Sequence, residues 1–264
     1  MQSRRPTAKR LILSLLSAPS MEKVRVGLLV HWGALFDIDA PAIRVAVGRL
    51  ARQALIAPVE RGVYTIGPAG QLMADTARQW MQVESRIRAW TGDWIVVHTG
   101  DLGRTDKTAL RGRERALRLG GFAALSTGLW CRPDNLARSL TDTRDELVNL
   151  GLEPAAIVLR ATEVRGIEPA SLHALWPRDE LEASYGAHIE AMRSSVEAMP
   201  TRTPADAARE TFLLGEAVIR LINADPLLPD KLVDAAARRE LIEAMKAYNE
   251  TGEAAWGAFS ATVG

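Results

Sequence analysis

This sequence lacks the residues that an intrachain disulfide bond or a membrane-spanning segment would need. Cys131 is the only cysteine among 264 residues. No disulfide can therefore form within the chain, and a cytoplasmic location is expected because thiols stay reduced there. No apolar run approaches the ~20 residues that a membrane helix needs. The hydrophobic share of 47% and the charged share of 25% are ordinary for a globular protein, which argues against fibrous and disordered classes.

The N-terminus places basic residues before a short apolar run, the order found in secretory signal peptides. Arg4, Arg5, Lys9 and Arg10 precede Leu11–Leu16. Ser14 interrupts the run, however, and the Ser-Ala-Pro-Ser that follows is a poor cleavage site. The leucines also have helical spacing, so a helix of a folded domain is expected here.

Net charge is almost absent from the chain as a whole, with 33 Lys and Arg against 32 Asp and Glu. Its distribution is uneven. Residues 1–90 hold 13 basic and six acidic side chains, a net charge of +7, residues 91–170 are neutral, and residues 171–264 carry −6. A basic first third predicts a polyanionic partner for that region, such as nucleic acid.

Three helices followed by a hairpin are predicted in the first third, the element order of a winged helix-turn-helix. The helices are expected at 11–16, at about 20–36, and from the N-cap residue Asp39 to about Leu55. Two extended segments, 56–60 and 63–66, meet at Arg61-Gly62, which is typical of a tight turn. One long linker helix is expected from Pro68 to about Arg88.

The helix after Asp39 separates cationic from apolar side chains, with Ile43, Val47 and Leu50 on the core side. Gly48 disfavours this helix by about 1 kcal/mol, which either close helix packing or close approach to DNA would explain. The alternative is an ordinary surface helix with solvated arginines. The predicted DNA-binding residues are Arg44, Gly48, Arg49 and Arg52 on the helix and Arg61 at the hairpin tip.

Strands and helices alternate in the middle third as βαββαβ, a ferredoxin-like order. Strands are expected at 94–99, 122–125, 129–132 and 155–161, with helices at 105–119 and 135–150. Only helices are expected beyond Pro169, at 178–199, 204–223 and 231–259. The predicted fold is α+β, divided into a head (1–67), a linker helix (68–90), a ferredoxin-like domain (91–168) and a helical C-terminal domain (169–264).

Enzyme signatures are weak. His31, His98, His173 and His188 lack the spacing of a zinc site, so no metal and no cofactor is expected. Asp93 and Asp101 flank the first middle strand, where acids serve as turn and cap residues or, alternatively, as ligands of a metal-dependent nuclease. The arginines of helix 105–119 either bind an anion or coat a solvated face.

Several short motifs, in this order and spacing, resemble the PaaX family of bacterial transcriptional repressors that control phenylacetic acid catabolism. They span nearly the whole chain and are Ala-Ile-Arg-Val-Ala-Val-Gly-Arg-Leu (42–50), Tyr-Thr-Ile-Gly-Pro-Ala-Gly (64–70), Trp-Thr-Gly-Asp-Trp (90–94), Leu-Gly-Gly-Phe (119–122), Thr-Gly-Leu-Trp-Cys-Arg-Pro (127–133) and Asp-Pro-Leu-Leu-Pro (225–229).

This resemblance implies a winged-helix head, a middle domain like the CRISPR-associated Cas2 proteins, and a helical C-terminal domain. It also implies a homodimer on a palindromic operator, released by an aryl-CoA thioester such as phenylacetyl-CoA. Arg44 and Arg49 match the family's recognition-helix arginines. The candidate effector-binding residues are Trp90, Trp94, Arg111, Arg118 and Arg220. A Cas2-like nuclease and a DNA-binding architectural protein without an effector are the alternatives.

The chain departs from the family pattern at three places. Val45 and Gly48 stand where small hydroxyl residues are usual, which predicts an altered operator. The hairpin carries one cation where relatives have several. Glu216, Ala217 and Arg220 stand where a His-Glu pair and basic residues are usual, which puts the usual effector in question.

Overall fold

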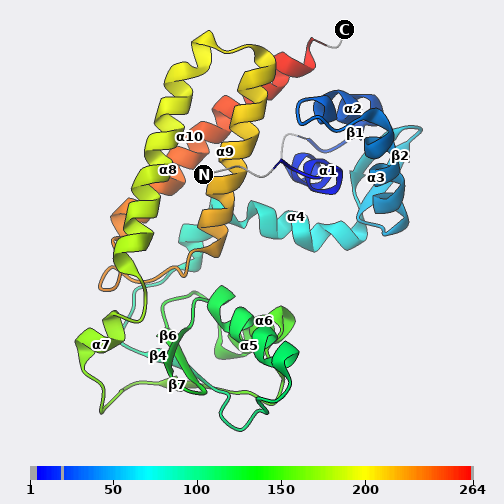
Figure 1. The fold of residues 1–264 in the computed structure, drawn as a ribbon. Helices are drawn as coiled ribbons and strands as arrows, with labels where there is room; N and C mark the ends of the chain where they lie inside the picture. Colours follow the sequence, from blue (N-terminus) through cyan, green and yellow to red (C-terminus); the bar gives the residue numbers. More distant parts are fainter. Residues whose placement is uncertain (1–4, 19–20, 263–264) are drawn as a thin grey trace. The chain divides into compact units, whose positions relative to one another are not determined.

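The computed structural model describes residues 5–18 and 21–262, and Figure 1 follows them from blue to red. These residues form two compact units. The first contains residues 1–82, 188–223 and 241–264, and the second contains residues 83–187 and 224–240. The four-part division expected from the sequence stays a prediction. Arg4 and the helix break expected at Pro19-Ser20 lie outside the described residues.

The first unit begins with three helices around a small antiparallel sheet. Their bounds are α1 Ala8–Ser17, β1 Val24–Arg25, α2 Val26–Ala34, α3 Ala40–Arg52, β2 Ile56–Glu60 and β3 Val63–Ile66. The sheet order is β1-β3-β2. Leucines of α1 pack with Trp32 of α2 and Ile43 of α3 in one buried cluster. Burial of these side chains is the main force that holds the three helices together.

Strand β1 lies within residues 20–36, for which the sequence predicted a continuous helix. Val24 pairs with Tyr64 and Arg25 with Val63, so β3 has strands on both sides. The helix therefore starts only at Val26, whose amide N–H donates to the Gly62 carbonyl at 2.8 Å. A strand of two residues has no periodicity of its own, since its partners come from distant sequence.

The single long helix expected from Pro68 to Arg88 is wrong. The segment divides into η1 Pro68–Gly70, α4 Gln71–Arg78 and η2 Gln79–Arg86, with Gln82 outside helical geometry. Ala74, Trp80 and Val83 are buried whereas Leu72 is 77% exposed. These buried positions do not share one stripe of a straight helix, so the chain bends to bury them.

The second unit contains a four-stranded antiparallel sheet with two helices on one face (Figure 1). The bounds are β4 Trp94–His98, α5 Lys107–Leu119, β5 Ala123–Ser126, β6 Leu129–Pro133, α6 Leu140–Leu150 and β7 Ile157–Ala161. The sheet order is β5-β6-β4-β7, and the βαββαβ sequence of elements is as expected.

Helix α6 starts later than the expected residue 135. Ser139 and Asp142 form a capping box that sets its first turn. Asn135 is instead buried, and its side-chain amide donates to the Leu227 carbonyl at 2.7 Å. The segment that begins at Asn135 is therefore not helical, and the Asn135 side chain makes a long-range contact instead.

Beyond residue 168 the described chain is helical, as expected. The bounds are α7 Pro169–His173, α8 Arg178–Ala198, η3 Met199–Thr201, α9 Pro204–Ala224 and α10 Ala235–Ser260. Phe212 of α9 and Trp256 and Phe259 of α10 join the same buried cluster as α1 to α3. Trp32 donates its indole N–H to Ser260 Oγ at 3.0 Å. The N-terminal helices and these parts of the C-terminal helices therefore share one core.

Candidate nucleic-acid interface

Helix α3 is fixed by its cap and by its buried face. Asp39 Oδ1 accepts a hydrogen bond from the Ala42 amide at 2.7 Å, which satisfies one free donor of the first turn. Ile43, Val47 and Leu50 are at most 3% exposed. The helix therefore presents one defined face to solvent.

The solvent face of α3 carries the three predicted arginines. Arg44, Arg49 and Arg52 are exposed, and none of them takes part in an ion pair within residues 5–18 and 21–262. Val45 lies among them and is 70% exposed. Unpaired guanidinium groups beside an exposed aliphatic side chain are suited to phosphates, guanine edges and thymine methyl groups.

Gly48 is exposed on this same face. A Cβ built at this glycine would have no heavy atom within 4 Å. Close packing within the described chain is thus excluded as the reason for this glycine. The other explanation that the sequence offered, close approach to DNA, stays a prediction.

The hairpin of β2 and β3 brings a second cation beside Arg61. Gly62 has a φ of +76°, which supplies the turn. Arg61 and Arg25 are both exposed, and Arg25 reaches the hairpin because β1 pairs with β3 opposite Val63. Sequence reasoning missed Arg25 because it placed that residue inside a helix. The exposed Glu60 lies on the same hairpin, so the hairpin carries charges of both signs.

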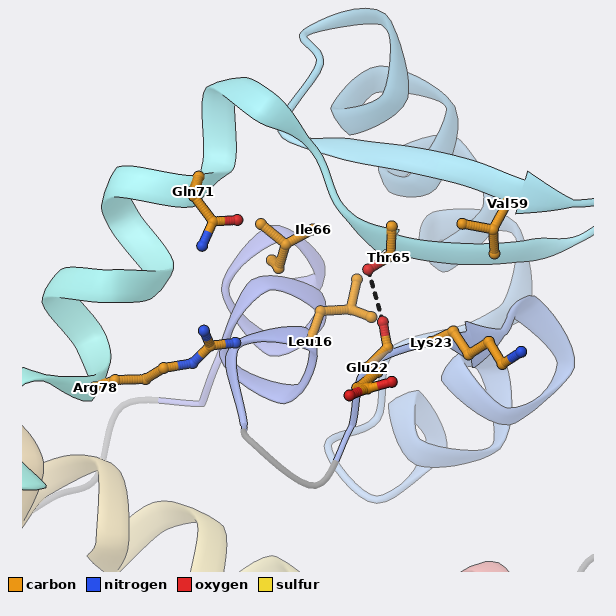
Figure 2. Close-up of a pocket in the computed structure, with 8 residues that line it drawn as sticks. All are labelled: Leu16, Glu22, Lys23, Val59, Thr65, Ile66, Gln71 and Arg78. Carbon is orange, nitrogen blue, oxygen red and sulfur yellow. Dashed lines mark hydrogen bonds between the residues drawn. The ribbon is translucent and has the colours of Figure 1, made fainter.

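A hollow of about 420 Å³ opens beside this hairpin, lined from α1, β2, β3 and α4. Figure 2 shows Thr65, whose hydroxyl donates to the Glu22 carbonyl at 2.6 Å. Arg78 closes another side and donates to the Ser17 carbonyl at 2.7 Å. The first bond holds the segment before β1 against β3, and the second joins the end of α4 to the end of α1. None of the predicted DNA-binding residues lines the hollow.

Of the predicted effector residues, Arg220 lies in the first unit and the other four lie in the second, where Trp90 and Trp94 contact each other. Trp94 is 6% exposed and stacks on Trp176 at 6.2 Å, while Trp90 meets Trp94 edge-on at 5.1 Å. The Trp90 indole N–H donates to the Asp93 carbonyl at 2.6 Å. These contacts give both tryptophans a packing role within the second unit.

The arginines of α5 divide between surface and core. Arg111 is exposed, and Arg118 pairs with Glu114 and lies 6.0 Å from the centre of the Trp130 ring. Arg113 is 3% exposed and forms several hydrogen bonds with Glu153. The expectation of one solvated cationic face is therefore wrong for Arg113, whose bonded partner lies 40 residues away.

The two carboxylates of the nuclease alternative lie in different surroundings. Asp93 is half-buried, whereas the Asp101 side chain is 89% exposed and lies 3.8 Å from His98. No cluster of three or more His, Cys, Asp or Glu side chains that could hold a metal occurs among the described residues. Nor does any helix in that part of the chain have the length and apolar character to cross a membrane.

Comparisons with known proteins agree with this architecture. The chain of the "Uncharacterized protein Rv0674 from Mycobacterium tuberculosis" has a similar structure, with a TM-score of 0.67 and 22% identity over 94% of this chain and 98% of that one. At that identity the likeness concerns the fold alone.

Sequence comparison adds a family. The profile of the PaaX-like protein C-terminal domain matches residues 176–258. "Transcriptional repressor PaaX" of Escherichia coli K12 is 30% identical over 155 residues, 56% of this chain and 47% of that protein. The alignment thus spans about half the length of this curated relative. From these two matches, the chain is similar to PaaX proteins over part of its length.

Proposed function

We propose that the protein is a DNA-binding transcriptional repressor and no enzyme, with a winged helix-turn-helix formed by α1 to β3. The observation that supports this most strongly is the face of α3. Three unpaired arginines project from it, while its opposite face is seated in the core. Insertion of such a helix into the major groove would place cations at both phosphates and base edges.

Each residue of this face has a separate role in the proposal. Arg44 and Arg49 contact guanine edges or phosphates, and Arg52 adds a phosphate contact. Val45 meets thymine methyl groups, and Gly48 lets the helix backbone come close to the DNA. At the wing, Arg61 is joined by Arg25.

The second unit, in this proposal, is a Cas2-like ferredoxin domain used for assembly. Two copies form a homodimer on a palindromic operator, as expected for two-fold half-sites. An aryl-CoA thioester such as phenylacetyl-CoA then favours a dimer whose head spacing mismatches the operator. Such a shift requires that the ligand binds the two dimer geometries with different affinity. The similarity to the PaaX repressor supports this part.

The experiment is a binding titration of the purified protein on DNA from upstream of its own gene, with scrambled DNA as control. It is repeated across a salt series with and without phenylacetyl-CoA. Arg44→Ala and Arg49→Ala should each weaken selective binding about 5- to 150-fold, the effect of one base contact of about 1–3 kcal/mol. Arg52→Ala should lower the salt slope by about 0.9.

The matched control is Arg209→Ala, which removes an exposed arginine from α9. It should leave operator affinity unchanged. Equal affinity of Arg44→Ala, Arg49→Ala and wild type would refute the assignment of α3. Selective binding that ignores phenylacetyl-CoA would keep the repressor and remove this effector, whereas salt-dependent binding without selectivity would favour the architectural alternative.

A further inference from the structure

A cavity of about 600 Å³ within the first unit is left unexplained by DNA binding. Its walls come from α1, the α4–η2 segment, α9 and α10. All of its lining residues belong to this one unit. The volume lies within the ~300–1,000 Å³ usual for small-molecule sites.

Aromatic side chains form the apolar part of the cavity. Trp80, Phe212 and Trp256 line it and are at most 8% exposed. The rings of Phe212 and Trp256 lie 6.0 Å apart. Flat apolar groups of a ligand would find aromatic surface here on more than one side.

Three glycines of α9 and α10 line the cavity. They are Gly215, Gly252 and Gly257. A Cβ at Gly257 would meet nothing within 4 Å, and a Cβ at Gly215 would meet only Met245 Cε, at 3.5 Å. Glycine disfavours a helix interior relative to alanine. Gly215 is buried and yet has room for a larger residue, so the space beside it is available to a ligand.

The polar edge of the cavity joins α1 to α9. Glu216 of α9 accepts hydrogen bonds from Arg10 Nε at 3.2 Å and from the Ser14 hydroxyl at 2.6 Å, both of α1. Arg220 lies 3.6 Å from the same carboxylate and is 55% exposed. Two guanidinium groups thus share one carboxylate, so the edge has spare capacity for an anion.

The remaining charged groups of the lining do not cancel this capacity. Arg78 also lines the cavity, with Asp75 at 3.8 Å. Glu253 accepts a hydrogen bond from Asn249 at 3.0 Å. Both residues belong to α10, whereas the Arg10–Glu216 contact joins α1 to α9. Arg78 and Glu253 thus have partners of their own, which leaves Arg10 and Arg220 as the two arginines beside Glu216.

We propose that this cavity binds an organic anion with an aromatic or aliphatic body, and that the head senses its occupancy through Arg10 and Ser14. The apolar body lies against Trp80 and Trp256, and the anionic group competes with Glu216 for Arg10 and Arg220. Competition weakens the α1–α9 contact and changes how α1 is held. The regulatory part rests on the proposed repressor function; the binding site does not.

The experiment measures ligand binding to the full chain without DNA, by calorimetry and tryptophan fluorescence. The probes are anilinonaphthalene sulfonate, phenylacetate, phenylacetyl-CoA and CoA alone. One bound molecule per chain is expected for at least one aromatic anion, with no comparable binding of CoA. Binding of phenylacetate would identify a free acid as sufficient, and binding of the thioester alone would place the CoA portion outside the cavity.

Cavity-filling variants locate the bound probe. Gly215→Leu and Gly252→Leu extend a side chain into the cavity and should weaken binding at least tenfold. Gly186→Leu, at an exposed helical glycine of α8 with nothing within 4 Å of its Cβ, is the matched control and should bind as wild type does. Arg220→Gln should weaken binding of the anionic probes.

The proposal fails if no probe binds below millimolar concentration, or if both filling variants bind as tightly as wild type. Titrations of the same variants on DNA without ligand separate this failure from that of the repressor. If wild type binds DNA selectively but the cavity-filling variants bind the probe as tightly as wild type does, only the proposed binding site is refuted. Loss of selective DNA binding by wild type overturns the repressor and leaves the binding result standing.

Discussion

Replacement of Gly48 by alanine should change stability and DNA binding in opposite directions. Gly48 lies in the interior of α3, and its Cβ position is open to solvent. Alanine is favoured over glycine at such a site by about 1 kcal/mol. For a chain of this size the gain corresponds to a rise in Tm of about 2–4 °C.

DNA binding should fall because the added methyl group would stand between two arginines on the face that we propose contacts DNA. Arg44 and Arg52 lie one turn before and one turn after Gly48. Any retreat of the helix axis lengthens the contacts of both. Loss of one good contact is about 1.4 kcal/mol, or tenfold in Kd, and Gly48→Leu should exceed Gly48→Ala.

The assay is calorimetric unfolding of each variant together with a titration on upstream DNA. Gly186→Ala is the control, since that glycine is helical, exposed and equally open. It should raise Tm by a similar amount and leave Kd unchanged. Full operator affinity in Gly48→Ala and Gly48→Leu would refute close approach of this face, and the glycine would then lack a structural explanation.

Three further predictions concern the second unit. Gly121→Ala should cost about 1–3 kcal/mol in urea unfolding, because Gly121 has a φ of +78° and a Cβ there would lie 2.8 Å from Arg132 Nη1; Gly92→Ala, with positive φ and open space, should cost less. The hydrogen bond from Arg113 lowers the pKa of Glu153 below its usual 4.5. The ionised Glu153 therefore stabilises the folded protein fully above pH 4.5, and this contribution is lost as the pH falls through the lowered pKa. Glu153→Gln should remove that part of the pH dependence of the free energy of unfolding. Burial raises the pKa of Cys131 to about 12, so its thiol should resist an aromatic disulfide reagent at pH 8 until the protein is denatured, and rapid reaction of the native protein would contradict its burial.

Helix α3 could be predicted from sequence because its signals are local. Asp39 as N-cap and the spacing of Ile43, Val47 and Leu50 lie within one segment, and the structure confirms both. The three long C-terminal helices were likewise expected within a few residues of their observed bounds. Their prolines and apolar spacing mark them without reference to other parts of the chain.

Strand β1 and Arg25 could not be predicted in this way. Val24 and Arg25 are extended only because β3, about 40 residues later, pairs with them. The second cation at the hairpin is thus a property of tertiary pairing. For the same reason the bend at Gln82 escaped prediction, since burial of Trp80 and Val83 decides it.

The cavity was also outside the reach of sequence reasoning, which marked only Glu216 and Arg220 from its lining. Arg10, Trp80 and Trp256 belong to segments that are far apart along the chain, and none of them forms a motif with the others. Trp90 and Trp94 were preferred because they are close in sequence. Aromatic residues at such spacing pack against each other as readily as against a ligand.

The shared core of the first unit limits how a ligand could act on DNA binding. Trp32, Phe212 and Phe259 belong to one buried cluster that joins the N-terminal helices to α9 and α10. Release of the whole head would expose this cluster, which is far costlier than the 1–3 kcal/mol typical of coupling between sites. The Arg10–Glu216 contact, by contrast, lies at a partly exposed edge. A ligand that competes there can tilt α1 while the aromatic core stays closed, and its effect on operator affinity should then be about 5- to 150-fold rather than complete.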